Sequence, residues 1–222
     1  MTSFIDMETN LEKLVSISSG ALCDDAPQIP EGLLNQSGVL GEQLIELLKN
    51  KNGFYAFESA LHLLPAGCKD SCTSLEEWNN DNSWRKEYGD QIQGHLFFAE
   101  DVFGVQFALC NLGVRKFDPE LGEFEDFATD LEEWAAKILE DYNYETGYQL
   151  AHDWQLQNGS LPTGKRLLPK IPFVLGGAYE VENLYAADAL KGMMFRADIW
   201  RQIRDLPDGS RIKLKVINRI SH

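Results

Sequence analysis

The chain has 222 residues, of which 44% are apolar and 25% charged, so it is long enough to bury a core and its composition excludes disorder of the whole chain. Its opening, MTSFIDMETN, has acidic residues where a signal peptide has basic ones, and no apolar run approaches the length of a membrane span. Four cysteines are too few for a disulfide framework at this length. We therefore expect a cytoplasmic protein that does not bind a membrane.

The net charge of −15 is unevenly distributed along the chain. Residues 1–164 contain 9 Lys and Arg against 29 Asp and Glu, whereas residues 165–222 contain 11 against 6. An acidic body repels nucleic acid and attracts a basic protein partner. The alternative interpretation is that the charge serves solubility alone.

The N-terminal part of the chain divides at about residue 30. Residues 1–30 contain a short helical pattern around Leu11 to Ile17 and then SSGALCDDAPQIP, which predicts a weakly ordered N-terminal segment before a domain of residues 31–222. The leucine spacing in LGEQLIELLKNKNG predicts a helix over residues 41–51.

The middle of the chain alternates between strand-like and helix-like patterns. GFYAFESALHLLP predicts one or two strands, and SLEEWNNDNSWRKEYG predicts a helix or packed loop anchored by Trp78 and Trp84. From Gly94, the segments GHLFFAED, GVQFALC and VRKFDPELGEF are short strands separated by turn residues, as in an antiparallel meander.

Two helices are expected after the meander. DLEEWAAKILEDY places its apolar residues on one face, so its charged residues must point outward. Thr129 and Glu132 have the spacing of a capping box, and Glu133 can pair with Lys137 one turn later. GYQLAHDWQLQNG predicts a second helix.

The C-terminal part predicts strands near Phe173 and Val181, a helix over residues 187–204, a turn at residues 207–209 and a last strand, SRIKLKVI. The helix has an apolar stripe of Leu190, Met193, Ala197, Trp200 and Ile203. Because helices and strands are grouped and mostly antiparallel, we expect an α+β fold, a single domain with a mainly antiparallel sheet covered by helices.

A glycine pair in PKIPFVLGGAYEVENLYAADALKG raises the question of a phosphate-binding loop. Such a loop lies between a strand and a helix and usually precedes a basic residue. The next charges after Gly176 and Gly177 are Glu180 and Glu182, which would repel a phosphate. A turn or bulge that lets the chain reverse or approach another strand closely is the better interpretation.

No catalytic arrangement is evident among the remaining reactive residues. Cys68 and Cys72, with His62 upstream, lack the second ligand pair of a structural zinc site. Carboxylates that are adjacent along the chain give no sign of facing each other across a glycosidase cleft. We therefore expect no enzyme, no metal and no cofactor, and we infer a binding protein by elimination. The four histidines are scattered and lie in no catalytic motif: His62, His95, His152 and His222.

Four segments together resemble bacterial proteins of the SUKH superfamily, which includes the fungal Smi/Knr cell-wall assembly regulators. They are GHLFFAEDVFGVQFAL, VRKFDPELGEFEDFATDLEEWAAKIL, TGYQLAHDWQLQNG and RLLPKIPFVLGGAYEVENLYAADALKGMMFRADIWRQIRDLPDG, and the resemblance covers roughly residues 30–217. It implies a compact α+β fold and, in many bacterial members, an immunity protein that binds and blocks a toxin, often a nuclease or deaminase. The alternative is a non-catalytic regulatory or scaffolding protein of the Smi/Knr type. The resemblance supplies no catalytic residues and does not locate the contact surface.

Charge suggests where a toxin could bind. Residues 120–145 contain ten carboxylates and one basic residue, Lys137. We hypothesise that part of this surface imitates the phosphate backbone that a basic nuclease would otherwise bind, without direct contact to nucleic acid. The alternative is a solvated helix face. We expect a monomer or weak homodimer that binds its partner through an acidic surface of Glu120, Glu123, Glu125, Asp126, Glu132, Glu133, Glu140 and Asp141.

Overall fold

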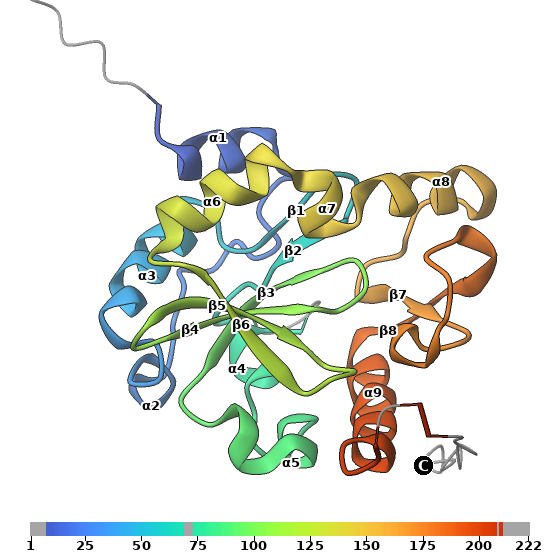
Figure 1. Cartoon of the computed structure of the whole chain (residues 1–222). Helices are drawn as coiled ribbons and strands as arrows, with labels where there is room; N and C mark the ends of the chain where they lie inside the picture. The colour runs from blue at the N-terminus through green and yellow to red at the C-terminus, as the bar shows by residue number, and fades with distance from the viewer. Residues whose placement is uncertain (1–7, 69–72, 208, 211–222) are drawn as a thin grey trace, which may run out of the picture.

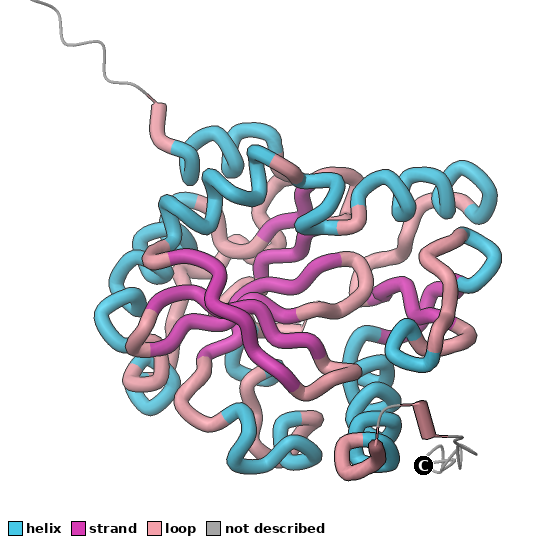
Figure 2. The backbone as a smooth tube through the Cα atoms, in the orientation of Figure 1, coloured by secondary structure: helices cyan, strands magenta, loops and turns pink. Residues whose placement is uncertain are grey.

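A six-stranded antiparallel sheet forms the centre of the protein (Figures 1 and 2). The structure is a computed structural model that describes residues 8–68, 73–207 and 209–210. The order of the strands in the sheet follows the chain, as the predicted meander requires. The strands are β1 (Phe54–Ala56), β2 (Leu61–Leu63), β3 (Leu96–Asp101), β4 (Gln106–Cys110), β5 (Gly113–Asp118) and β6 (Glu123–Ala128).

Helices cover both faces of this sheet, which explains why β3 and β4 are buried along their whole length. On one face, Trp134 packs against Phe98, with ring centroids 5.2 Å apart. On the other face, Trp84 packs against Phe97 at 4.9 Å. The predicted α+β fold with a helix-covered antiparallel sheet is confirmed. The longer helices are α1 (Asn10–Ile17), α3 (Gly41–Asn50), α6 (Leu131–Glu140), α8 (Tyr148–Asn158) and α9 (Ala189–Ile203), and the short ones are α2 (Glu31–Leu34), α4 (Leu75–Trp78), α5 (Arg85–Tyr88) and α7 (Tyr142–Thr146).

The N-terminal helix belongs to the packed domain. Leu14 and Val15 of α1 are buried, and α1 lies against α6 (Figure 1). The ammonium group of Lys51 donates hydrogen bonds to the carbonyls of Val15 at 2.7 Å and Ser19 at 2.8 Å. The helix predicted around Leu11 to Ile17 is present as α1. It packs against the domain, so residues 10–17 do not belong to a weakly ordered segment outside it. Residues 1–7 lie outside the described residues.

The predicted strands near Phe173 and Val181 were wrong. Both positions lie in single turns of 3₁₀-helix, η3 (Phe173–Leu175) and η4 (Val181–Asn183). These turns connect two strands of a small antiparallel sheet, β7 (Lys165–Pro169) and β8 (Leu184–Asp188). The Asn183 side chain holds the connection closed through hydrogen bonds with the backbone of Ile171 and Ala178. The predicted last strand lies almost wholly outside the described residues.

The glycine pair forms a turn, as expected. Gly176 ends η3 with a φ of +86°, a conformation that side chains rarely adopt. A Cβ atom on Gly177 would lie 1.9 Å from the carbonyl oxygen of Ile171, so only glycine permits this close approach of the backbone. The pair therefore serves the fold.

The two long predicted helices are present, with differences near their starts. Asp130, not Thr129, caps α6 by accepting a hydrogen bond from the Glu133 backbone N–H at 2.8 Å. Glu133 is consequently the third helical residue, and its carboxylate contacts Thr129 and Lys137, the latter at 3.0 Å as predicted. In α9, Trp200 is buried as expected, whereas Leu190 is 37% exposed.

Candidate functional site

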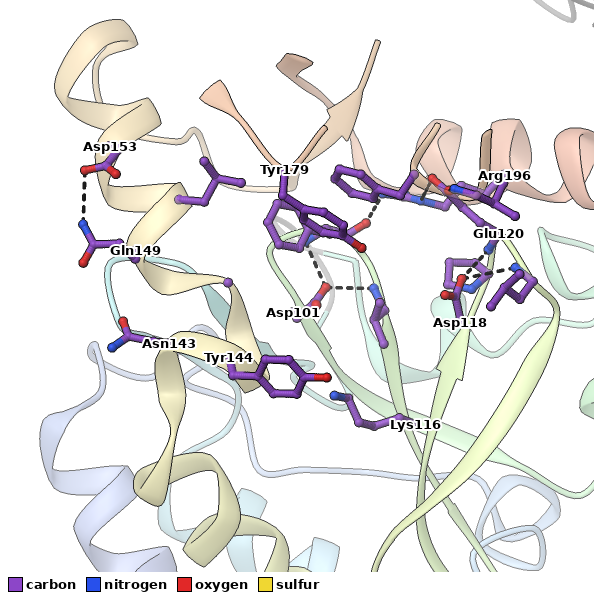
Figure 3. A pocket seen from close by; sticks show the side chains of 18 residues that line it. Asp101, Lys116, Asp118, Glu120, Asn143, Tyr144, Gln149, Asp153, Tyr179 and Arg196 are labelled. Carbon is purple, nitrogen blue, oxygen red and sulfur yellow. Dashed lines mark hydrogen bonds and ion pairs between the residues drawn. The ribbon is translucent and has the colours of Figure 1, made fainter. Parts of the chain in front are cut away.

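A cleft of about 890 Å³ opens at one end of the strands of the large sheet (Figure 3). The β3–β4 and β5–β6 turns meet there because alternate turns of an antiparallel meander lie at the same end of the sheet. The opposite walls come from α7, α8, α9 and the connection between β7 and β8. We call this site the Asp101 cleft, and the lining residues that matter below are Asp101, Lys116, Asp118, Glu120, Tyr144, Tyr179 and Arg196.

Asp101 ends β3 with its side chain only 5% exposed. Its Oδ1 accepts hydrogen bonds from the backbone N–H groups of Phe103 at 2.9 Å and Val105 at 2.8 Å, which fixes the β3–β4 turn. Its Oδ2 accepts no hydrogen bond from any residue that the structure describes, and this oxygen keeps some exposure to solvent. Burial raises the pKa of Asp101 to about 7, although the charges of Lys116 and Arg196 act in the opposite direction.

Two acidic residues of the β5–β6 turn have structural partners. Asp118 Oδ1 accepts hydrogen bonds from the backbone N–H groups of Glu120 at 2.7 Å and Leu121 at 3.2 Å. Glu120 is buried, and its Oε2 accepts a hydrogen bond from the Val174 backbone N–H at 2.9 Å. Burial raises the pKa of Glu120. Its Oε1 lies 3.9 Å from the guanidinium of Arg196, so the pair joins the turn to α9.

The two basic residues of the cleft are each paired with a glutamate. Arg196 lies beside Glu120 and also donates a hydrogen bond to the carbonyl of Phe103. The ammonium group of Lys116 lies 2.8 Å from Glu145 and 3.7 Å from Glu125. Burial alone would lower the pKa of Lys116, but the hydrogen bond to Glu145 and its charge outweigh burial and raise it. The positive charges of the cleft are therefore compensated.

Aromatic side chains form the rim. Phe173 and Tyr179 stack with their ring centroids 3.8 Å apart, and Phe103 meets both rings edge to face. Tyr179 is 65% exposed and Tyr144 is 78% exposed, and both line the cleft (Figure 3). Exposed tyrosines beside a buried carboxylate provide a place where a partner can bury both apolar area and charge.

The structure does not assemble the predicted acidic surface as one patch. Glu120 does not lie on an exposed face, since it is buried and its Oε2 accepts a hydrogen bond from the Val174 backbone N–H. Glu125 pairs with Lys116, whereas its neighbour Asp126 pairs with Arg115 at 2.8 Å. Because successive residues of β6 face opposite sides of the sheet, these two carboxylates point in opposite directions.

On α6 the predicted carboxylates mostly serve as caps. Glu132, expected to point outward, accepts hydrogen bonds from the first backbone N–H groups of α1, those of Asn10 and Leu11. Asp141 caps α7 by accepting a hydrogen bond from the Tyr144 N–H at 3.1 Å. Of the eight predicted carboxylates, only those of Glu123 and Glu140 have no hydrogen-bond or ion-pair partner among the described residues.

A second buried carboxylate, Glu100, lies directly before Asp101 in β3 and points to the opposite face of the sheet. Its Oε1 lies 2.8 Å from Arg166 and 3.0 Å from His62, and its Oε2 accepts a hydrogen bond from Gln106 at 3.1 Å. Burial alone would raise the pKa of Glu100, but the charge of Arg166 and the hydrogen bond with His62 lower it to about 2. We call these four residues the Glu100 cluster.

His62, considered above as a metal ligand beside Cys68, is thus a partner of Glu100. Within residues 8–68, 73–207 and 209–210, no three His, Cys, Asp or Glu side chains form a group suited to a metal ion. Cys72 lies outside the described residues.

Asp101, Tyr144 and Tyr179 are not among the candidate site residues that were predicted from the sequence. Asp101 and Asp118 lie among the turn residues that separate the predicted strands, and their Oδ1 atoms do bind the backbone of these turns. The predicted meander already implied that their two turns lie at the same end of the sheet. That signal could have indicated a shared site, whereas no local pattern places α7 or Tyr179 beside it.

The fold and the cleft together define an α+β domain with a partly buried acidic site. No protein-family model and no curated protein matches the chain. Among solved structures, the crystal structure of Atu4351 from Agrobacterium tumefaciens is similar, with a TM-score of 0.56, 14% identity, and coverage of 86% of this chain and 88% of that chain. At this identity the likeness concerns the fold alone. No helix in the described part of the chain combines the length and apolar character needed to cross a membrane.

Proposed function

We propose that the protein acts in the cytoplasm by binding another protein, as an immunity protein that occludes a cognate toxin stoichiometrically and without catalysis. The observation that carries this proposal is the pair of exposed tyrosines, Tyr144 and Tyr179, beside the acidic Asp101 cleft. Tyrosine is enriched among the residues that contribute most to protein–protein binding. The toxin as partner comes from the resemblance to the SUKH superfamily.

The charge of the chain supports a basic partner. A nuclease domain needs positive charge to bind the phosphate backbone, and a protein with a net charge of −15 attracts such a domain and accelerates association. Glu123 and Glu140 are exposed and unpaired among the described residues, so they are able to contribute to this long-range attraction.

Four polar groups of the cleft are committed to contacts that hold its walls, which suits a binding site. Asp118 and Glu120 are used in backbone hydrogen bonds of the β5–β6 turn and its neighbour. Lys116 and Arg196 are used in ion pairs. These contacts hold the walls of the cleft in place, which a binding site requires.

The test is co-purification of the tagged protein from its native host, followed by a protection assay. We expect one partner in a one-to-one complex, carrying a basic toxin domain, and we expect co-expression of this protein to restore growth to cells that express that domain. A housekeeping assembly as the partner would support the regulatory alternative instead. A purified toxin partner whose toxicity is unaffected by this protein would contradict the proposal.

A further inference from the structure

We propose that the Asp101 cleft binds a basic side chain, arginine or lysine, which the partner protein inserts between Asp101 and the tyrosines of the rim. The inference rests on the proposed function and names the chemistry that the partner presents. It is carried by a carboxylate that is almost completely buried and has one oxygen without a partner in the described chain.

Asp101 has one carboxylate oxygen, Oδ2, that accepts no hydrogen bond from a described residue. A buried carboxylate is usually saturated with donors, because an unpaired buried charge is costly. In Asp101 both backbone N–H groups of the turn bind Oδ1, so the turn needs only one oxygen. An asparagine would provide the same acceptor without a charge. The second oxygen and the charge are therefore not needed for the turn, and both are available to a ligand.

The charged residues that line the cleft select the sign of the ligand's charge. The lining of the cleft contains Asp101, Asp118, Glu120 and Asp153 against Lys116 and Arg196. Both basic residues are paired with glutamates, and one of these, Glu145, is not part of the lining. The carboxylates that remain without a basic partner within 4.0 Å among the described residues are Asp101, Asp118 and Asp153. The cleft therefore favours a cation.

The aromatic rim suits the apolar stem of a basic side chain and the face of its head group. Arginine and lysine bury their methylene stems along apolar surface. Their charged heads are attracted to aromatic rings. Tyr179 stacked on Phe173, with Phe103 edge-on, provides a rigid aromatic wall, and Tyr144 stands exposed across the opening (Figure 3). A neutral ligand would use the rings but would leave the Asp101 charge unpaired.

Proton binding supports the same ligand class. Burial raises the pKa of Asp101 to about 7, so the folded protein retains a proton on this carboxyl at pH values where a free aspartate is ionised. A cation stabilises the charged form, so its binding releases a proton and weakens as the pH falls below 7. The titratable and charged groups that interact with Asp101 are Lys116, Arg196 and Tyr179.

The experiment is a pair of titrations with matched variants. Asp101→Asn retains the hydrogen bonds of the turn and removes the charge. Asp126→Asn makes the same change on β6 outside the cleft, where Asp126 faces away from Lys116. Each protein is titrated with the peptide acetyl-Gly-Arg-Gly-amide and with versions that carry lysine, citrulline or glutamate, and NMR shifts of the backbone amides are followed.

We expect the arginine or lysine peptide to saturate shifts at Phe103, Val105 and Tyr179 in the wild type and in Asp126→Asn. In Asp101→Asn, and with citrulline, binding should weaken by about tenfold or more, because a desolvated charge pair is lost. Equal binding to Asp101→Asn, equal binding of citrulline, stronger binding of the glutamate peptide, or the absence of saturable shifts would each overturn the proposal.

The co-purified partner separates this inference from the proposed function. If the toxin binds wild type and Asp101→Asn with the same affinity, the inference that a basic side chain enters the cleft is overturned, while the proposed immunity function stands. Conversely, saturable binding of the arginine peptide in a protein for which no protein partner is found would overturn the assignment of the cation to a partner protein and the proposed function with it.

Discussion

Glu100 and Asp101 are consecutive residues of β3 with buried carboxyl groups, but their environments differ in kind. Glu100 has Arg166, His62 and Gln106 around both of its oxygens, and its pKa falls to about 2. Asp101 has two backbone donors on one oxygen, and its pKa rises to about 7. Donors on both oxygens hold a buried carboxylate in its charged form, whereas a carboxylate with a free oxygen beside a cleft is destabilised in that form and can bind a ligand.

The largest effect is expected in the Glu100 cluster. Arg166→Ala leaves Glu100 buried without its main charge partner, so we expect a loss of about 3–5 kcal/mol in the free energy of unfolding. Denaturant unfolding measures it. Arg115→Ala is the control, because it removes a surface pair whose Asp126 is 84% exposed and should cost less than about 1 kcal/mol. Equal losses in both variants would show that the Glu100 cluster is not structural in this sense.

Asp101 and Glu100 should affect the pH dependence of stability in opposite directions. The folded-state pKa of Asp101 lies above its ordinary value of 3.8, so the folded protein retains a proton that the unfolded chain loses. Its contribution to stability is therefore present below about pH 4 and is lost as the pH rises to about 7. Glu100 stabilises the fold above its ordinary value of 4.5, and this contribution is lost as the pH falls towards 2.

Asp101→Asn isolates the first of these effects. We expect the variant and the wild type to have similar stability near pH 4, and the variant to be more stable at pH 8 by roughly 2–4 kcal/mol. Denaturant unfolding at several pH values measures the difference, and Asp126→Asn serves as the control. A variant that is less stable than the wild type at pH 8 would contradict the unsaturated environment assigned to Asp101.

The aromatic rim should contribute to partner binding. Tyr179→Ala removes an exposed ring that lines the cleft, and we expect the dissociation constant of the toxin complex to rise about 30-fold, or about 2 kcal/mol. Tyr185→Ala is the matched control, since Tyr185 is 41% exposed on β8 and does not line the cleft. Calorimetry measures both. The reverse ranking of the two variants would place the interface elsewhere.

Loss of a carboxylate from α6 should change stability according to the hydrogen-bond partners of that carboxylate. Glu132→Ala removes the acceptor for the first N–H groups of α1 and should cost about 1 kcal/mol of stability, as the loss of a helix cap does. Glu140→Ala removes an exposed carboxylate and should change stability by less than about 0.5 kcal/mol. Thermal unfolding compares the two, and a larger loss for Glu140→Ala would refute the assigned capping role.

The smallest effect is expected from the exposed acids of the predicted surface. Reversal of Glu123 and Glu140 to lysine should slow association with a basic partner a few-fold and leave dissociation nearly unchanged, because exposed charges act mainly through long-range attraction. Stopped-flow association at two salt concentrations measures it. A large increase in the dissociation rate would restore the acidic surface as the contact site.

The sequence was informative where the chemistry is local. The two-residue and helical periodicities predicted the meander and α6, and the turn at Gly176 followed from its neighbours. It was not informative where a partner lies far along the chain. Glu120 is buried by Val174, 54 residues away, and Glu132 caps a helix 122 residues earlier. The Asp101 cleft likewise depends on α7 and Tyr179 packing at the same end of the sheet, which no local pattern encodes.

The most direct test of the account is the hydrogen-exchange footprint of the toxin on this protein. If the partner inserts a basic side chain beside Asp101, the amides of Phe103, Val105 and Tyr179 should exchange more slowly in the complex than in the free protein, while the exposed end of α6 around Glu140 should be unchanged. Protection confined to α6 and β6, with the β3–β4 turn unaffected, would contradict the account and favour the acidic surface.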